Sequence, residues 1–136
     1  MFNNKKNKIL SSSTIDAMPI TTVLGIDIVF TGEIKGDSLV RIDGRVCGNL
    51  LPRQGVVVGE KAIITGDITT DYVVIYGKVI GNITCKELTI KKSGVVNGDI
   101  QTNIIEIEMG GKYNGKIAAQ VQTAIEEPAE EPVENK

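Results

Sequence analysis

The chain has 136 residues, with 15 Lys and Arg against 17 Asp and Glu, and it contains no histidine. Such a length predicts one domain with room for a modest core. The near-neutral balance leaves no basic face to neutralise phosphates, so nucleic acid is not expected as a partner. The lack of histidine argues against a zinc site. We therefore expect no metal and no nucleotide cofactor.

Residues 1–20 form a basic leader. The segment is too polar for a signal peptide, and its apolar runs are too short to span a bilayer. One interpretation is simple disorder. The other is a weak membrane-binding segment, in which Met1 and Phe2 insert while Lys5, Lys6 and Lys8 lie at anionic headgroups. Each lysine would contribute about 1 kcal/mol at such a surface, so binding by one copy is weak and binding by a polymer is strong.

Residues 21–118 repeat one pattern. The stretch from Ile90 to Ile100 (IKKSGVVNGDI) returns from Val58 to Ile68 and from Ile107 to Ile117. Shorter versions run from Ile42 to Leu50 and from Ile75 to Ile83, and a degenerate first copy runs from Ile26 to Ile34. Each copy closes on a glycine, and these glycines are Gly32, Gly48, Gly66, Gly81, Gly98 and Gly115. A spacing of about 17 residues held over several copies is the signature of a solenoid.

Apolar residues within each copy alternate with polar ones. Ile42, Val46 and Leu50 share one parity, and the residues between them are polar or glycine. This is the alternation of strands with one buried face, and no helical period fits it. The sequence therefore predicts an all-β fold, a parallel β-helix of about six coils with three short strands in each. Stacking at about 4.8 Å per coil gives a rod on the order of 25–30 Å long.

The residues before the closing glycines indicate what happens at the ends of the rod. The inward column is predicted to be Phe30, Val46, Ile64, Val79, Val96 and Tyr113, so its aromatic residues fall in the two terminal coils. Neither end carries a capping segment, and bare coil edges pair with other chains. Two alternatives remain: the rings plug the core of a monomer, or like ends meet in a polymer. The residues predicted for the two contacts are Leu24, Ile26, Ile28, Phe30 and Ile34 at one end and Ile105, Ile107, Tyr113 and Ile117 at the other.

Residues 119–136 are rich in glutamate and proline, and we expect an acidic disordered tail. Its expected roles are solubility, spacing or recruitment of a partner. Within the repeats, Cys47 has the outward parity and Cys85 the inward parity. Two unmatched thiols indicate a reducing compartment.

An enzyme is the alternative function class. The segment from Val58 to Thr69 resembles the hexapeptide repeat of left-handed β-helix acyltransferases, but those enzymes use a histidine base that this chain lacks. Asp67, Asp71 and Asp99 are interpreted as scattered surface charges rather than a calcium cluster. The glycines follow a structural period and open no helix, which excludes a phosphate-binding loop. The enzyme-like alternative is thus a β-helix that has lost its active site.

The chain most closely resembles the bactofilin family of bacterial cytoskeletal proteins. The resemblance covers residues 20–118 and is carried by coils such as Val40–Leu50 and by the triplets ending at Ile68, Ile83 and Ile100. It implies a right-handed β-helix that assembles without nucleotide into non-polar filaments. It also implies attachment to the inner face of the cytoplasmic membrane, with cell-envelope proteins as partners and scaffolding of cell-shape, cell-wall or appendage machinery as the function.

Overall fold

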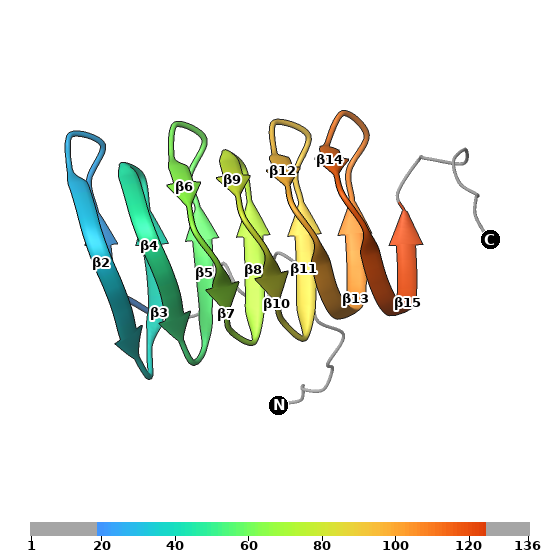
Figure 1. Cartoon of the computed structure of the whole chain (residues 1–136), viewed down its shortest axis with the longest axis horizontal. Coiled ribbons are helices and arrows are strands. Elements are labelled where there is room, and N and C mark those ends of the chain that lie inside the picture. Colours follow the sequence, from blue (N-terminus) through green and yellow to red (C-terminus); the bar gives the residue numbers. More distant parts are fainter. Residues whose placement is uncertain (1–18, 125–136) are drawn as a thin grey trace, which may run out of the picture.

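The structure, a computed structural model, describes residues 19–124, and every regular element in that range is a strand (Figure 1). In chain order the strands are β1 (Ile20–Leu24), β2 (Val29–Gly36), β3 (Leu39–Ile42), β4 (Arg45–Pro52), β5 (Gly55–Val58), β6 (Ile63–Thr65), β7 (Ile68–Thr69), β8 (Tyr72–Ile75), β9 (Lys78–Ile80), β10 (Ile83–Thr84), β11 (Glu87–Ile90), β12 (Val95–Asn97), β13 (Ile100–Ile107), β14 (Lys112–Asn114) and β15 (Ile117–Ala124).

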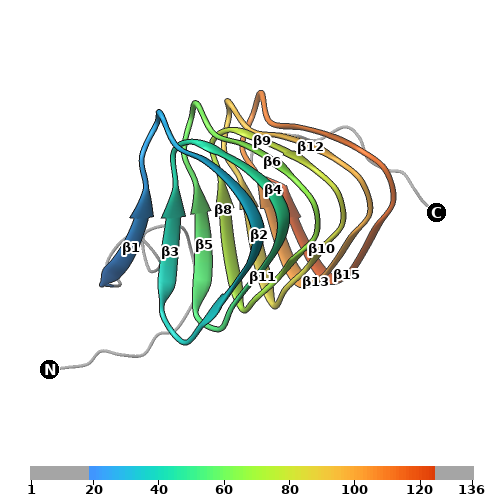
Figure 2. The same ribbon diagram turned by 60° about the vertical axis from the view of Figure 1, so that its left-hand side comes forward.

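These strands stack into three parallel faces that enclose one core (Figure 2). Face A contains β1, β3, β5, β8 and β11, followed by the second halves of β13 and β15. Face B contains the first halves of β2 and β4, followed by β6, β9, β12 and β14. Face C contains the remaining halves of β2, β4, β13 and β15, with β7 and β10 between them. The predicted parallel β-helix of about six coils is confirmed.

The register of the strands confirms the predicted columns. On face B, Phe30 pairs with Val46, and the column continues through equivalent residues to Tyr113. The interior of the rod is filled almost entirely by branched aliphatic side chains, because each coil places residues of one parity inside. Burial of each such side chain contributes about 1.5–3 kcal/mol. The largest fully buried ones are Ile42, Leu50, Ile64, Ile68, Ile75, Ile83, Leu88, Ile90, Ile100, Ile105 and Val46.

A ladder of glycines forms the corner between faces B and C. The six closing glycines have φ between +139° and +149°, a range that side-chain-bearing residues rarely adopt. From Gly48 onward, a Cβ atom would overlap the carbonyl oxygen of the glycine one coil earlier, as at Gly81 over Gly66. Glycine is therefore needed here both for the turn and for the close stacking of the backbones.

A second ladder, made of side-chain amides and carboxylates, runs beside the glycines. The Oδ1 atoms of Asn49, Asp67, Asn82 and Asp99 each accept a hydrogen bond from the backbone N–H one coil further on, at 3.0–3.2 Å, and the last donor is Lys116. Asp67 and Asp99 are thus not the scattered surface charges that the sequence predicted. The repeat places them in register, so that they satisfy backbone donors that the turn leaves unpaired.

Candidate polymerisation interfaces

The first coil leaves an open sheet edge. Strand β1 pairs only with β3, and β2 pairs only with β4, among residues 19–124. One side of each of these strands therefore presents backbone donors and acceptors without a neighbour in the described part of the chain. Such an edge is a template for pairing with another copy.

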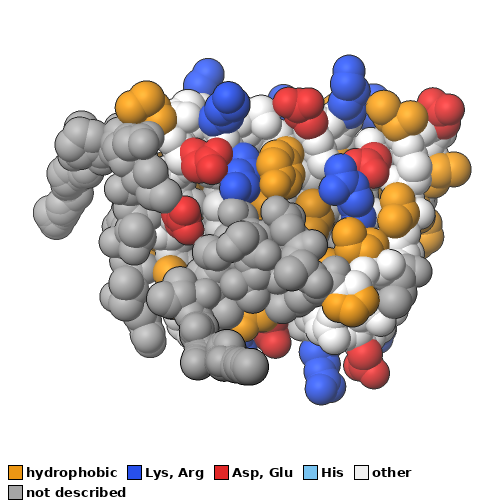
Figure 3. Space-filling model, turned by 180° about the vertical axis from the view of Figure 1, so that it is seen from behind, with side chains coloured by type: hydrophobic (Ala, Val, Ile, Leu, Met, Phe, Trp, Pro, Cys, Tyr) orange, Lys and Arg blue, Asp and Glu red, His pale blue; other side chains and the backbone are white. Residues whose placement is uncertain are grey.

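Exposed apolar side chains surround this edge. The exposed fractions are 40% for Ile20, 55% for Val23, 59% for Ile26, 46% for Ile28 and 67% for Val29. In Figure 3, where the first coil lies at the right, hydrophobic side chains gather at that end of the rod. A contiguous apolar surface of this kind marks an interaction site. We call these five residues the N-terminal patch.

The structure places the residues predicted for this end in two groups. Ile26 and Ile28 are exposed within the N-terminal patch, whereas Leu24, Phe30 and Ile34 are partly buried and pack on the core. Ile20, Val23 and Val29 were not predicted. Val23 and Val29 have the outward parity, which predicts contact with solvent, so only their apolar character could indicate a role at this end.

The last coil ends differently from the prediction. Strand β15 pairs with β13 from Ile117 to Ala124, so regular structure continues beyond the predicted boundary at residue 118. The sequence of this strand alternates, but its residues are mostly small or polar (IAAQVQTA), which made it resemble the tail that follows. The pairing of β15 is explained by the burial of its neighbour β13, and not by the hydrophobicity of β15 itself.

This extra strand covers two of the predicted interface residues. Ile105 and Ile107 have exposed fractions of 0% and 7%, because β15 lies beside them on face A. They are core residues in the single chain and can contact a neighbouring copy only if β15 moves away. Tyr113 is 44% exposed, Ile117 is partly buried, and Met109, which was not predicted, is 60% exposed. At this end, within the described residues, β15 forms the free edge of faces A and C, and β14 forms the free edge of face B.

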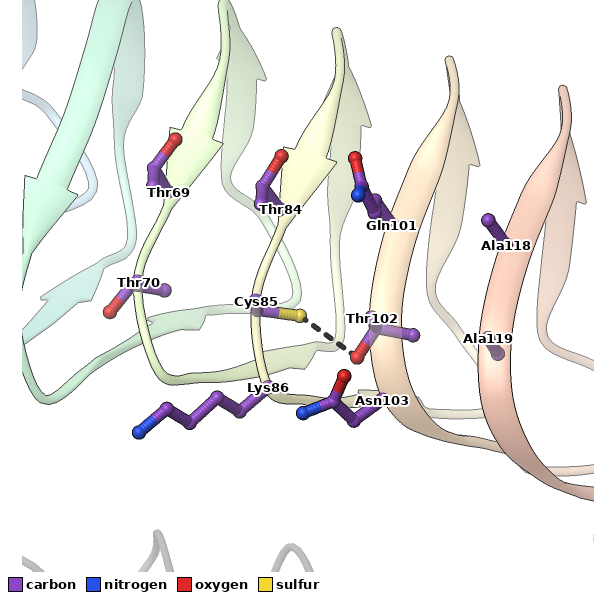
Figure 4. A pocket seen from close by; sticks show the side chains of 10 residues that line it. All are labelled: Thr69, Thr70, Thr84, Cys85, Lys86, Gln101, Thr102, Asn103, Ala118 and Ala119. Atoms are coloured by element: carbon purple, nitrogen blue, oxygen red, sulfur yellow. Dashed lines mark hydrogen bonds between the residues drawn. The ribbon is translucent and has the colours of Figure 1, made fainter.

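A shallow hollow of about 520 Å³ lies on face C and at its corner with face A (Figure 4). Its side chains come from four successive coils and are mostly threonine, alanine and amide residues. Among the residues that line the hollow, Cys85 has the most reactive type of side chain. The Cys85 thiol donates a hydrogen bond to Thr102 Oγ1 at 3.4 Å. Burial raises the pKa of Cys85 to about 11, against the weaker opposing effect of that hydrogen bond. A thiol that stays protonated is a poor nucleophile, so this hollow has no activated group for covalent catalysis.

The two cysteines should consequently differ in reactivity. Cys47 is exposed and Cys85 is buried, as their parities predicted. With a water-soluble thiol reagent at pH 8, we expect one rapid reaction per chain, at Cys47, and a second at least roughly 100-fold slower, because thiolate formation limits it. Mass mapping of the labelled site checks this result. The Cys47→Ser variant serves as the control, and rapid labelling of that variant in the folded state would contradict the expected burial of Cys85.

Among the described residues, no group of three His, Cys, Asp or Glu side chains is placed to hold a metal ion. Between residues 19 and 124, the structure has no helix long and apolar enough to cross a bilayer. The residues predicted to bind the membrane, Met1, Phe2, Lys5, Lys6 and Lys8, lie outside the described range.

Comparison with known proteins gives consistent matches. A family profile described as "Bactofilin: Polymer-forming cytoskeletal" matches residues 22–118. Bactofilin BacO of Myxococcus xanthus is 35% identical over 97 residues, covering 71% of this chain and 77% of BacO. Bactofilin BacP of the same organism is 27% identical over 123 residues, covering 90% of this chain and 50% of BacP.

Two solved structures share the fold. The double helical filaments of Thermus thermophilus bactofilin, determined by electron cryomicroscopy, match with a TM-score of 0.70 and 28% identity, covering 73% of this chain and 99% of the other. The crystal structure of a point mutant of the Thermus thermophilus bactofilin matches with a TM-score of 0.51 and 21% identity, covering 76% and 97% of the two chains. The second match supports the fold alone.

Proposed function

Because the chain belongs to the bactofilin family of polymer-forming cytoskeletal proteins, we propose that it assembles end to end, without nucleotide, into non-polar filaments on the inner face of the cytoplasmic membrane. The observation that carries the proposal is a rod whose core is complete in the middle and whose two ends are apolar and open. Face edges at both ends lack partners within residues 19–124, and exposed hydrophobic side chains lie at each.

Like ends are proposed to meet. The N-terminal patch contains five large aliphatic side chains, while the other end offers Tyr113 and Met109. Contact of each end with its own copy through a two-fold axis gives an isologous interface, and two alternating isologous interfaces give a filament without polarity. In this arrangement Phe30 and Tyr113 lie near the centres of the two contacts.

Assembly needs no energy source in this proposal. Burial of apolar surface at both ends supplies the driving force, at about 25 cal/mol per Å². Six of the 15 glycines form the corner ladder. None of the others opens a helix within residues 19–124, where every regular element is a strand, so the described residues contain no glycine-rich loop of the kind that cradles a phosphate. The polymer is proposed to act as a scaffold for cell-shape, cell-wall or appendage machinery and to bind cell-envelope proteins.

Filament formation by the purified chain tests the proposal. We expect the protein to sediment and to form filaments in negative-stain microscopy after exhaustive removal of nucleotide, and added ATP or GTP should change neither result. Small discrete oligomers at all concentrations would contradict end-to-end assembly. They would favour the enzyme-like alternative, a β-helix related to acyltransferases.

Attachment to the membrane is proposed to depend on the leader. Deletion of residues 1–8 removes Met1, Phe2 and all three lysines of the leader, so we expect filaments of the shortened chain to lose co-sedimentation with anionic liposomes at least roughly tenfold. Filament formation itself should persist. Replacement of Lys5, Lys6 and Lys8 by glutamine is the matched control for charge, and it should weaken binding without abolishing filaments. Equal liposome binding by the deletion variant would disprove a membrane role for the leader.

A further inference from the structure

The outer surface of face A carries a strip of buried apolar side chains. Val57 and Val74 point away from the core, because their neighbours of opposite parity fill it. Their exposed fractions are nevertheless both 2%, and Leu39 on the adjoining strand is 0% exposed. Tyr72 and Tyr76 pack against these three residues. We call the five residues the face A strip.

Two comparable outward aliphatic residues elsewhere are exposed. Val23 is in the same column as Val57 but in the first coil, and it is 55% exposed. Ile80 lies on the outside of face B with a strand on either side, and it is 40% exposed. The valines of face A thus have near-zero exposure where the fold alone would leave an aliphatic side chain in contact with water. The face A strip therefore behaves as a covered surface.

The covered surface continues onto two polar residues of the next strand. Glu87 and Thr89 point outward from β11, and their exposed fractions are 5% and 2%. Oε1 of Glu87 has no hydrogen-bond partner among the described residues. Burial, with a smaller contribution from the nearby Glu106, raises the pKa of Glu87 to about 7. A buried carboxylate with a free acceptor favours a cationic or donor-bearing occupant.

Charge decides between the candidate occupants. Both terminal segments outside residues 19–124 join face A, since residues 1–18 lead to β1 and residues 125–136 follow β15. The second segment carries five glutamates against one lysine, an acidic excess that would repel Glu87 and Glu106, whereas the first carries three lysines against one aspartate. A second copy applying the same strip would oppose Glu87 with its own equivalent, which is also unfavourable. The basic leader is the complementary partner.

We propose that residues 1–18 dock on the face A strip, with Ile9 and Leu10 against Val57 and Val74 and the leader lysines toward Glu87. The length of the chain permits this arrangement. Ten residues from Leu10 to Ile20 span up to about 33 Å when extended, while β1 and β8 are separated by three strand spacings, on the order of 14 Å.

Docking gives the leader two competing positions. The same residues that we propose to bind anionic membranes would be occupied while they lie on the rod. The apparent affinity of the chain for membrane would then equal the affinity of the free leader multiplied by the fraction of chains whose leader is released. This consequence rests on the proposed membrane role, whereas docking itself does not.

Tryptophan fluorescence tests docking directly. The chain contains no tryptophan, so a Leu10→Trp variant of the full chain reports on that position alone. We expect its emission to be blue-shifted and its quenching by acrylamide to be roughly three- to fivefold weaker than in the same variant carrying Val74→Asp. The matched control is Ile80→Asp, on the uncovered face B, which should leave the tryptophan shielded. Circular dichroism verifies the fold of each variant.

A second variant keeps the rod unchanged. Ile9→Asp lies in the leader, so a gain in quenching of Leu10→Trp in its presence cannot come from a damaged sheet. Equal quenching in all of these variants would overturn the proposal. Shielding that appears only on assembly, and is absent at concentrations where the chain is not polymerised, would also overturn it, because the cover would then be a neighbouring copy.

Liposome binding separates docking from the membrane role. If both hold, Val74→Asp should increase co-sedimentation of the full chain with anionic vesicles about two- to fivefold, and deletion of residues 1–8 should abolish it. Shielding of Leu10→Trp without any liposome binding would support docking and reject the membrane role. Liposome binding with an unshielded tryptophan would reject docking alone.

Discussion

Replacement of Tyr113 by arginine is expected to stop assembly at a dimer joined through the N-terminal patch. Tyr113 ends the inward column of face B, and its side chain is 44% exposed. In a two-fold contact the same ring would be buried. A guanidinium at this position would bring two unpaired cations together, at a cost of about 3–5 kcal/mol per contact. That cost corresponds to a loss of affinity of at least roughly 100-fold.

The corresponding change at the other end gives the mirror result. Phe30 begins the same column and packs partly on the core, so Phe30→Arg should leave a dimer joined through the Tyr113 ends. The variant with both substitutions should be a folded monomer. Analytical ultracentrifugation over a range of concentrations distinguishes filament, dimer and monomer, and circular dichroism reports whether the β-helix is intact.

Ile80→Arg is the matched control for both variants. Ile80 has nearly the same exposure as Tyr113, 40% against 44%, but it lies in the middle of the rod on face B. Arginine at that position should therefore leave filaments unchanged. Long filaments of Tyr113→Arg with an intact fold would show that this end takes no part in assembly. Loss of filaments in Ile80→Arg would instead indicate a contact along the side of the rod.

Much of the fold follows from local sequence. Period-two alternation and closing glycines predict which residues stack, because a β-helix repeats one coil and each column keeps its parity. Strand β15 was missed because its pairing depends on the neighbouring Ile105 and Ile107 rather than on its own apolar content. The Asn49–Asp99 ladder was missed for a related reason: single side chains of this type look like solvent-exposed residues until the register aligns them.

The candidate interfaces were harder to predict. Open ends follow from the lack of a cap, and Phe30 and Tyr113 follow from the column that contains them. Parity alone, however, assigns every outward residue to solvent, which misplaces the face A strip. Outward residues become informative only when their exposure differs from that of equivalent residues, as it does between Ile80 and Val74. Such differences depend on tertiary contacts that a periodic pattern does not encode.

The glycine ladder predicts the largest effect on stability. Gly81 has a φ of +147°, and a Cβ there would overlap the carbonyl oxygen of Gly66 in the coil before. Alanine must therefore adopt a strained backbone, which costs about 1–3 kcal/mol, and must also push two stacked coils apart. Because this overlap is with backbone rather than a flexible side chain, we expect a total loss of at least about 4–5 kcal/mol, the range of the most damaging single substitutions.

Such a loss is a large part of the typical 5–15 kcal/mol stability of a domain, so Gly81→Ala should be largely unfolded or should melt far below the parent protein. Because assembly also stabilises the fold, the comparison belongs in the monomeric variant with both Phe30→Arg and Tyr113→Arg. Gly36→Ala is the matched control, since Gly36 has no positive φ and a Cβ there would meet nothing within 4 Å. Urea unfolding followed by circular dichroism should show a change of less than about 1 kcal/mol for the control. If Gly81→Ala had the same unfolding midpoint as Gly36→Ala, the corner could open without breaking the stack. Close stacking of the coils would then not explain why each coil has a glycine at this corner.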